Sequence, residues 1–204
     1  MKYKSVVFEG TDGSGKSTIV ALLKEELAKK GIPYISPREP GATSIGEQIR
    51  SVILNKDNTE MTGDTEMLLF AAARSQNIHE NILPAIKDGK FVLLDRFVES
   101  SYVYQGYARG IGFEKIKAIN DIATAGWAPD AVILLDISTE DAVARIMANP
   151  DREKNRLDLE KTEFLRKTRE GYLLRAKENP TYHIVDASKP IDEVYASVKE
   201  VLGL

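Results

Sequence analysis

Gly10-Thr11-Asp12-Gly13-Ser14-Gly15-Lys16-Ser17 is the stretch that decides the fold of this chain. It matches the phosphate-binding loop pattern Gly-x4-Gly-Lys-Ser/Thr at every defined position. Residues 5–9, directly before it, predict a short buried strand, and residues 17–30 predict an amphipathic helix with an apolar side. Because the motif belongs between a strand and a helix, this context favours a phosphate site over a glycine-rich turn that binds nothing.

The loop is predicted to bind the phosphates of a nucleoside triphosphate. Glycines let backbone N–H groups turn inward around a polyphosphate, and the helix N-terminus adds partial positive charge. Lys16 would reach the β- and γ-phosphates, and the Ser17 hydroxyl would ligate Mg²⁺. The predicted phosphate-binding residues are Gly10, Thr11, Asp12, Gly13, Ser14, Gly15, Lys16, Ser17 and Thr18. GTPases, motors, small-molecule kinases and transporter ATPases share such a loop, so it does not identify the reaction.

Length and composition are those of one globular domain over residues 1–204. The chain has 204 residues, of which 43% are hydrophobic and 29% are charged. Its net charge of −3 argues against a broad basic surface, and so against a nucleic-acid partner. The absence of cysteine excludes disulfides and thiolate metal sites. We expect a cytoplasmic protein with no membrane partner, because the sequence has neither a signal peptide nor an apolar segment long enough to span a bilayer.

Short apolar runs alternate with longer helical patterns along the chain. The predicted strands are 5–9, 34–38, 91–95, 131–136 and 182–186, and the predicted helices are 17–30, 44–54, 62–88, 113–125, 139–147, 159–179 and 191–202. This alternation implies right-handed crossovers and a mainly parallel sheet. The predicted fold is an α/β P-loop NTPase three-layer sandwich, with a five-stranded parallel sheet flanked by helices.

Charged residues stand at the predicted carboxyl ends of the strands, where parallel sheets bind their ligands. Asp95 and Arg96 directly follow an apolar strand. Asp95 could hold a water on Mg²⁺ opposite Ser17, as a Walker-B carboxylate does, and Arg96 would point into the same cleft. Asp136, at the end of the next predicted strand, is the competing candidate, and the neighbouring Arg96 favours Asp95. Ordinary polar strand ends are the alternative interpretation.

Four further motifs follow the loop, which belongs to the run Phe-Glu-Gly-Thr-Asp-Gly-Ser-Gly-Lys-Ser (8–17). They are Arg-Glu-Pro-Gly (38–41), Leu-Phe-Ala-Ala-Ala-Arg (69–74), Asp-Arg-Phe-Val-Glu-Ser-Ser (95–101) and Tyr-Gln-Gly-Tyr-Ala-Arg-Gly (104–110). With these motifs the chain resembles the thymidylate kinase family from its first predicted strand to its last helix. The resemblance implies an enzyme that uses ATP and Mg²⁺ to phosphorylate thymidine monophosphate (dTMP) to dTDP, in dTTP biosynthesis. It also implies a homodimer.

The chemistry of such a transfer needs cations more than a general base. The second pKa of a monophosphate is about 6, so the acceptor is already a dianion near neutral pH. Two anionic phosphates must therefore be brought together and their charge neutralised. Arg38 and Arg96, each at a strand end, are candidates for gripping the acceptor's phosphate, because guanidinium forks fit phosphate oxygens. The alternative for each is a surface ion pair.

The resemblance implies the remaining contacts to the acceptor. They are Asp12 with the 3′-hydroxyl, Phe70 stacked on thymine, Arg74 hydrogen-bonded to a thymine carbonyl, Ser101 near the base, Tyr104 against the sugar's 2′ position, and Gln105 as a second base contact. Phe70 and Arg74 are four residues apart on a predicted helix and therefore share a face. Without the resemblance, Phe70 would be interpreted as a core residue.

Residues 145–158 have the composition of a mobile loop, which would form a small lid over ATP; a solvated charged connector is the alternative. The family has one subclass with a catalytic arginine in the phosphate loop and another with it in the lid. Positions 11–14 carry no basic residue, so the chain resembles the lid subclass, and the predicted catalytic residues are Lys16, Arg96, Arg152 and Arg156. The family often has Asp-Arg-x-Glu where this chain has residues 155–158 as Asn-Arg-Leu-Asp, which leaves open whether Arg152 or Arg156 closes on the phosphates.

Two other functions stay open on the sequence. One is a kinase of another nucleotide, such as another deoxynucleoside monophosphate. The other is a nucleotide-dependent switch, which needs a guanine-reading motif such as Asn-Lys-x-Asp. The run at 55–57, Asn-Lys-Asp, lacks that spacing and does not follow a late strand, which argues against the switch.

Overall fold

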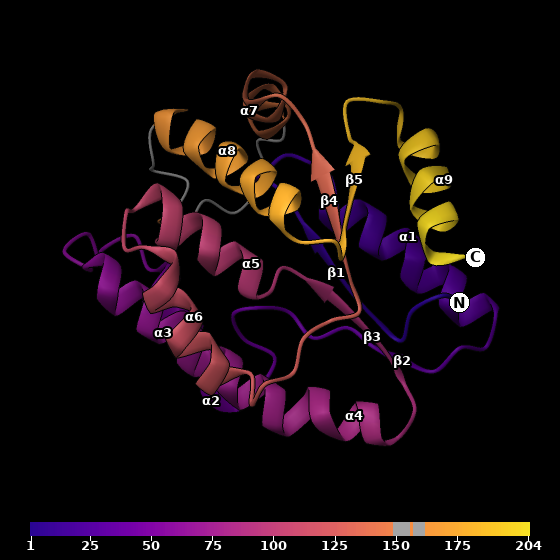
Figure 1. Ribbon diagram of the computed structural model, residues 1–204, viewed down its shortest axis with the longest axis horizontal. Coiled ribbons are helices and arrows are strands. Elements are labelled where there is room, and N and C mark those ends of the chain that lie inside the picture. The colour runs from indigo at the N-terminus through magenta and orange to yellow at the C-terminus, as the bar shows by residue number, and fades with distance from the viewer. Residues whose placement is uncertain (149–155, 157–161) are drawn as a thin grey trace.

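The computed structural model describes residues 1–148, 156 and 162–204. Its core is a sheet of five strands in the order β2-β3-β1-β4-β5, and every neighbouring pair is parallel (Figure 1). The strands are β1 (Ser5–Glu9), β2 (Tyr34–Ile35), β3 (Phe91–Asp95), β4 (Ala131–Asp136) and β5 (Tyr182–Asp186). The predicted α/β fold with a five-stranded parallel sheet is confirmed.

The second strand is shorter than the sequence pattern predicted. The prediction was residues 34–38, whereas β2 ends at Ile35. Pro37 lies beyond this end, and it has no backbone N–H to donate to a neighbouring strand. Arg38 forms an isolated bridge with Asp95, so the segment still reaches the carboxyl edge of the sheet.

Helices flank the sheet. They are α1 (Lys16–Lys29), α2 (Ser44–Leu54), α3 (Gly63–Asn77), the π-helix η1 (Ile78–Ile82), α4 (Leu83–Lys87), α5 (Val98–Ser101), the π-helix η2 (Tyr102–Ala108), α6 (Phe113–Ala123), α7 (Thr139–Met147), α8 (Thr162–Glu178) and α9 (Ile191–Leu202). The bounds of α2, α7 and α9 are those predicted. The predicted start of the long helix at residue 159 lies outside the described residues. None of the described helices has the length and apolar composition needed to cross a bilayer.

The prediction of one helix over residues 62–88 was wrong in detail. The structure divides this stretch into α3, the π-turn η1 and α4. Pro84 stands in the first turn of α4, where its missing N–H removes one hydrogen-bond donor from the helical ladder. At this junction the N–H of Leu83 donates to the carbonyl of Ile78, the wider spacing of a π-bulge, so the helical path continues past the proline.

Residues 98–108 are helical although the sequence pattern did not predict it. Aromatic residues and Gly106 give this stretch weak helix propensity, so packing must supply the stabilisation. Val103 is fully buried there and shares a core with Tyr172 of α8 and Leu134 of β4. This segment matters for function because Ser101, Tyr104 and Gln105 lie on it.

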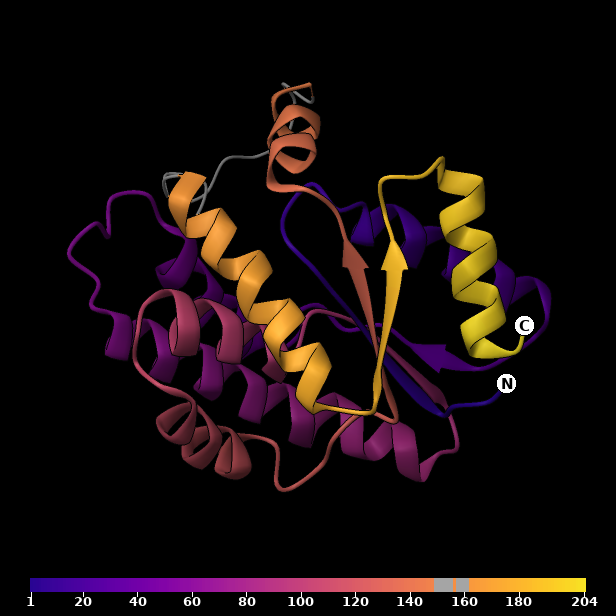
Figure 2. The ribbon, with the colours of Figure 1, turned by 45° about the horizontal axis from the view of Figure 1, so that its top comes forward.

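The sheet separates two groups of helices, which gives the predicted three layers (Figure 2). Alternate residues of β1 point to opposite faces: Val6 and Phe8 pack with α1 and α9, and Val7 packs with η1. All are fully buried, as expected for a parallel strand covered on both sides. The helices α1 and α9 cover one face, and η1 and α8 lie on the other.

The carboxyl edge of the sheet brings the loop after β1 beside the end of β3, because Phe8 pairs with Asp95. The loop itself packs tightly on its neighbours. At Gly10, where φ is 139°, a Cβ atom would stand 2.5 Å from the carbonyl oxygen of Leu135. At Gly13, with φ of 82°, it would stand 2.4 Å from the carbonyl oxygen of Ala142. Only glycine satisfies the conformation and the close approach together.

Candidate active site

Lys16 is held inside the phosphate-binding loop. Its Nζ atom donates to the carbonyl oxygens of Gly10 and Thr11, both at 2.9 Å, and to the Ser14 hydroxyl at 3.4 Å. The residue is only 6% exposed. Burial is the main cause that lowers the pKa of Lys16 to about 8, with repulsion from Arg96 added and nearby carboxylates opposing. The ammonium group is therefore poised to gain from any anion that enters the loop.

Ser17 and Asp95 lie together at the edge of the loop. The Ser17 hydroxyl donates to Asp95 Oδ2 at 2.9 Å, which joins the start of α1 to the end of β3. The competing Walker-B candidate, Asp136, instead accepts two hydrogen bonds from Arg169, at 2.8 and 3.0 Å. This arrangement favours Asp95 over Asp136 as the Walker-B carboxylate beside the phosphate-binding loop. Within the described residues, no cluster of three or more acidic or histidine side chains could hold a metal ion by itself.

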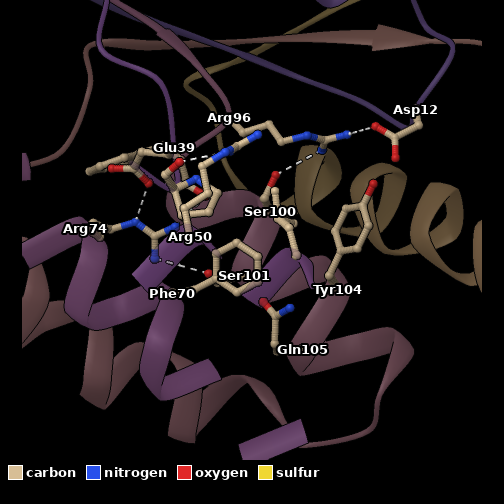
Figure 3. A pocket seen from close by; sticks show the side chains of 13 residues that line it. Asp12, Glu39, Arg50, Phe70, Arg74, Arg96, Ser100, Ser101, Tyr104 and Gln105 are labelled. Carbon is tan, nitrogen blue, oxygen red and sulfur yellow. Dashed lines mark hydrogen bonds and ion pairs between the residues drawn. The ribbon is translucent and has the colours of Figure 1, made fainter. Parts of the chain in front are cut away.

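Two cavities meet at this edge of the sheet. The first, of about 460 Å³, is polar and lies over the loop; it is lined by Asp12, Gly13, Gly15, Lys16, Ser17, Thr18, Arg38, Glu39, Arg50, Asp95 and Arg96. The second, of about 160 Å³, is lined by Asp12, Glu39, Pro40, Arg50, Leu54, Phe70, Arg74, Arg96, Phe97, Ser100, Ser101, Tyr104 and Gln105 (Figure 3). Asp12, Glu39, Arg50 and Arg96 line both, so the two cavities form one continuous cleft.

The second cavity gathers most of the residues that the resemblance assigned to the acceptor. Asp12, Phe70, Arg74, Arg96, Ser101, Tyr104 and Gln105 all line it, although they come from three separate parts of the chain. Phe70 is half-buried and belongs to none of the described apolar core clusters, so the alternative interpretation as a core residue is not supported. Its ring lies near Ser101 in Figure 3.

Arg96 lies where the two cavities meet. Its backbone has a φ of 70°, a left-handed conformation that is unusual for a residue with a side chain. Its guanidinium donates to Asp12 Oδ1 at 2.6 Å, and to the hydroxyls of Ser100 and Tyr172, both at 3.1 Å. These contacts hold the guanidinium where the two cavities meet.

A buried carboxylate, Glu9, supports this position of Arg96. Glu9 is fully buried and accepts hydrogen bonds from the backbone N–H groups of Phe97 and Ser100 and from the Tyr172 hydroxyl at 2.7 Å. It thereby fixes the backbone just after Arg96, which explains how the strained conformation is maintained. Burial raises the pKa of Glu9, while Arg96 and the hydrogen bonds act against that rise.

Arg74 is held from four directions at the other end of the cavity. Its Nε donates to Glu39 Oε2 at 2.8 Å, and its two terminal nitrogens donate to Ser101 Oγ at 3.1 Å, Asn120 Oδ1 at 2.5 Å and the Phe97 carbonyl at 3.1 Å. The side chain is 2% exposed. These contacts use four of the five guanidinium N–H groups, so one N–H group of Nη2 is left to donate to a ligand.

Tyr104 and Arg38 differ from Arg74 in how they are held. The buried hydroxyl of Tyr104 has no hydrogen-bond partner among the described residues, so a polar ligand atom in the cavity would satisfy it. The Arg38 side chain is 62% exposed and forms an ion pair with Glu47 at 2.5 Å. Arg38 lines the cavity over the loop and not the second cavity, and its neighbour Glu39 lines both.

The structure describes only one of the two arginines that were predicted to act from the lid. Arg152 lies outside the described residues. Arg156 is buried: its Nε donates to the Ile53 carbonyl at 3.0 Å, and its Nη2 forms an ion pair with Glu66 of α3. Among the described residues, Arg156 lines neither of the two cavities. Its predicted approach to the phosphates remains a prediction.

Sequence reasoning did not single out several residues of this site. Arg50 of α2 lines both cavities and donates to the Pro40 carbonyl at 2.9 Å, and Glu9, Glu39, Glu66, Ser100 and Tyr172 hold the arginines described above. Glu9 and Glu39 lie inside the motifs 8–17 and 38–41, so the sequence could have identified them as candidate site residues. Arg50 and Tyr172 lie in ordinary amphipathic helices, where only the tertiary structure reveals that Arg50 lines the cleft and that Tyr172 contacts Arg96.

Comparison with known proteins gives consistent results. A family model described as thymidylate kinase matches residues 8–198. A thymidylate kinase of Clostridium novyi (strain NT) is 48% identical over 198 residues, which cover 97% of each chain. Another of Geobacillus sp. (strain WCH70) is 50% identical over 197 residues, 96% of this chain and 94% of its own. A third, of Thermoanaerobacter sp. (strain X514), is 47% identical over 203 residues, 99% of this chain and 98% of its own.

The lowered pKa of Lys16 predicts a proton uptake that accompanies polyphosphate binding. At pH 9, above the pKa of about 8, the buried amine is mostly neutral, and bound phosphates raise its pKa again. We expect ATP binding to take up close to one proton at pH 9 and little at pH 7, as measured by calorimetry in two buffers of different ionisation enthalpy. Lys16→Arg should abolish the uptake, because a guanidinium stays protonated at both pH values. Uptake that is equal in both proteins would contradict this role of Lys16.

Proposed function

Because this chain belongs to the thymidylate kinase family, we propose that the continuous cleft is its active site, with the donor nucleotide over the loop and the acceptor in the second cavity. The protein phosphorylates dTMP to dTDP with ATP as the donor. The observation that carries the assignment is the sharing of Asp12 and Arg96 by both cavities, since phosphoryl transfer needs the two anions to meet end to end.

On the donor side, residues 10–18 surround the triphosphate of ATP. Lys16 gives up its carbonyl contacts and neutralises charge on the β- and γ-phosphates, because a phosphate oxygen is a stronger acceptor than a carbonyl. Backbone N–H groups at the start of α1 complete the anion site. Gly10 and Gly13 are required for the close packing of this loop.

Mg²⁺ fits the pair formed by Ser17 and Asp95. Their oxygens are 2.9 Å apart at the edge of the polar cavity, and Mg²⁺ is usually held by one or two protein oxygens, waters and substrate phosphates instead of a complete protein cage. Ser17 would ligate the ion, and Asp95 would hold one of its waters. When bound, the ion neutralises charge on the β- and γ-phosphates.

On the acceptor side, the nucleobase occupies the inner end of the second cavity. Phe70 stacks on the ring, Arg74 donates to a thymine carbonyl, and Ser101 and Gln105 contact the base edge. Tyr104 lies against the sugar at its 2′ position, and Asp12 accepts from the 3′-hydroxyl. Arg74 is already fixed by four acceptors, which reduces the conformational entropy lost on binding.

The acceptor phosphate lies at the junction of the cavities, where Arg96 and Arg38 hold it. One of its oxygens attacks the γ-phosphorus of ATP as the bond to the bridging oxygen of ADP breaks, and no general base is required for this dianion. Arg96 exchanges part of its contact with Asp12 for phosphate oxygens, and Arg38 does the same from its exposed ion pair with Glu47. Lys16, Arg96 and a lid arginine, Arg152 or Arg156, are the catalytic cations.

The remaining features of the proposal concern the whole chain. Residues 1–204 act as one nucleotide kinase domain in the cytoplasm, with residues 145–158 as the lid. A homodimer is supported by the resemblance and by exposed apolar side chains on three neighbouring helices, with Ile45 and Val52 on α2, Leu68 on α3 and Ile122 on α6. The helix α3 contacts both α2 and α6, so these side chains belong to one region of the surface.

The proposed reaction is tested with an assay of ADP release from ATP against dTMP, dUMP, dCMP and dGMP. We expect the highest kcat/KM with dTMP. Lys16→Ala should remove most of the transfer while the circular dichroism spectrum stays unchanged, because Lys16 stabilises charge on the transferred group. Turnover close to wild type in folded Lys16→Ala protein would be incompatible with the proposal.

The lid assignment predicts a specific effect of Arg156→Ala. An arginine that meets charge in the transition state can contribute on the order of 10³-fold or more in kcat. We expect kcat to fall strongly while the KM for ATP changes little. The matched control is Arg166→Ala, which removes an exposed arginine paired with Glu140. A loss in Arg156→Ala below about tenfold, or about 1.4 kcal/mol of transition-state stabilisation, would mean that another cation fulfils this role.

The homodimer is tested by light scattering after size-exclusion chromatography. We expect a mass of twice the chain mass of 22.7 kDa. Leu68→Glu should yield monomers, because it places a charge in the proposed apolar interface. Ile184→Glu is the matched control, since Ile184 is similarly exposed, at 55% against 53% for Leu68, but lies on the edge strand β5. A monomeric wild-type protein would contradict the assembly.

A further inference from the structure

We propose that Glu66 is a positioning residue that fixes the side-chain amide of Gln105 with its oxygen, and not its nitrogen, turned to the acceptor base. The inference rests on the proposed function and states what the pocket selects. It selects a pyrimidine whose ring nitrogen carries a proton, such as thymine or uracil, over cytosine, whose corresponding nitrogen has a lone pair instead.

The contact between these two side chains is buried and short. Gln105 lies on η2 and is 2% exposed, and Glu66 lies on α3 and is 1% exposed. The Nε2 atom of Gln105 donates to Glu66 Oε1 at 2.7 Å. Gln105 also lines the acceptor cavity together with Phe70 and Arg74, so the orientation of its amide determines which polar atom meets a ligand there.

Glu66 can only accept hydrogen bonds in this position. Arg109 approaches both carboxylate oxygens, with its Nε 2.8 Å from Oε1 and its Nη2 3.0 Å from Oε2, and Arg156 pairs with Oε2. Burial tends to raise the pKa of Glu66, but hydrogen bonds from Arg109, Gln105 and Arg156 outweigh it, so the pKa lies below its usual value. An ionised carboxylate has no proton to donate, and the side of the Gln105 amide that meets it must be the nitrogen.

The other side of the amide is then an acceptor that faces the cavity. In Figure 3 the amide oxygen of Gln105 is on the side nearer the Phe70 ring. The base is proposed to stack on that ring. Thymine offers a ring N–H beside its carbonyls, so the N–H donates to Gln105 while Arg74 donates to a carbonyl. With cytosine, two acceptors would face each other in a buried site, and such an unpaired contact is a strong basis for rejection.

Glu66→Gln keeps the shape of the side chain but allows its amide to donate. Two arginine groups, from Arg109 and Arg156, face the Oε2 side, whereas one arginine nitrogen and Gln105 face the Oε1 side. The new amide therefore keeps its oxygen toward the two arginines and turns its nitrogen to Gln105. Gln105 must then rotate to accept this hydrogen bond, and its own nitrogen faces the base.

The experiment compares kcat/KM for dTMP and dCMP in the wild-type protein and in Glu66→Gln. We expect the ratio of kcat/KM for dCMP to that for dTMP to rise about tenfold or more in Glu66→Gln. The turned Gln105 amide would then oppose its N–H to the ring N–H of thymine, whereas it could donate to the ring nitrogen of cytosine. Arg74 still disfavours cytosine in both proteins. The same shift should appear in the Kd values for the two monophosphates measured by calorimetry. A purely structural role of Glu66 would lower activity on both acceptors by the same factor.

Two controls separate orientation of the amide from loss of a buried ion pair. Glu99→Gln makes the same substitution in a carboxylate that Arg175 contacts at 2.8 and 3.0 Å, outside the acceptor cavity. Arg156→Ala removes one partner of Glu66 and leaves its contact with Gln105. Both variants should keep the wild-type ratio of dCMP to dTMP, whatever they do to the rate or the thermal stability.

The exchanged pair, Glu66→Gln with Gln105→Glu, provides a rescue. A carboxylate at position 105 presents an acceptor to the base in either orientation, so the preference for dTMP over dCMP should return at least in part. An unchanged ratio in folded Glu66→Gln protein would overturn the role of Glu66 while the wild-type protein still phosphorylates dTMP. A wild-type protein that fails to phosphorylate dTMP would instead overturn the proposed function.

Discussion

Mutual repulsion among cations is the physical constraint on which this site depends. A cleft that grips two phosphates must hold several guanidinium groups close together before either phosphate arrives. The structure meets this constraint by pairing five arginines with carboxylates: Asp12 for Arg96, Glu39 for Arg74, Glu47 for Arg38, and Glu66 for Arg109 and Arg156. Lys16 is held differently, by two carbonyl oxygens and a hydroxyl, and burial followed by repulsion from Arg96 lowers its pKa to about 8.

The degree of burial of each ion pair indicates whether its arginine is a fixed part of the pocket or can move to a ligand. Arg74 and Glu39 are almost fully buried, and loss of one partner from such a pair costs about 3–5 kcal/mol because the other charge is left uncompensated. Arg74 is therefore a fixed part of the pocket wall. Arg38 and Glu47 are largely exposed, and an exposed pair contributes at most about 1 kcal/mol. Arg38 can exchange its carboxylate for a phosphate at little cost, which suits a residue that must respond to a ligand.

The sequence allowed prediction of the sheet and of most helices, because apolar runs and helical periodicity are local properties. It failed where the local pattern was ambiguous. Pro37 shortened β2, Pro84 coincided with a π-turn, and residues 98–108 became helical through packing of Val103 and not through propensity. For the site, motif residues such as Arg74 and Arg96 were identifiable, whereas some of the partners that hold them, Asn120 and Tyr172, lie outside every motif. Glu66 and Gln105 are 39 residues apart, and only the packing of α3 beside η2 brings them together.

The charge balance around Glu66 connects the lid to the rest of the site. The phosphate loop has no basic residue at positions 11–14, and in the proposed function a lid arginine supplies charge when ATP is bound. If Arg156 leaves Glu66 for the phosphates, Arg109 still contacts both oxygens of that carboxylate, and Gln105 still contacts one. Glu66 thus keeps enough donors to stay ionised after Arg156 departs. Under this proposal, the same buried carboxylate can release Arg156 to one half of the cleft without losing its contact with the Gln105 amide in the other.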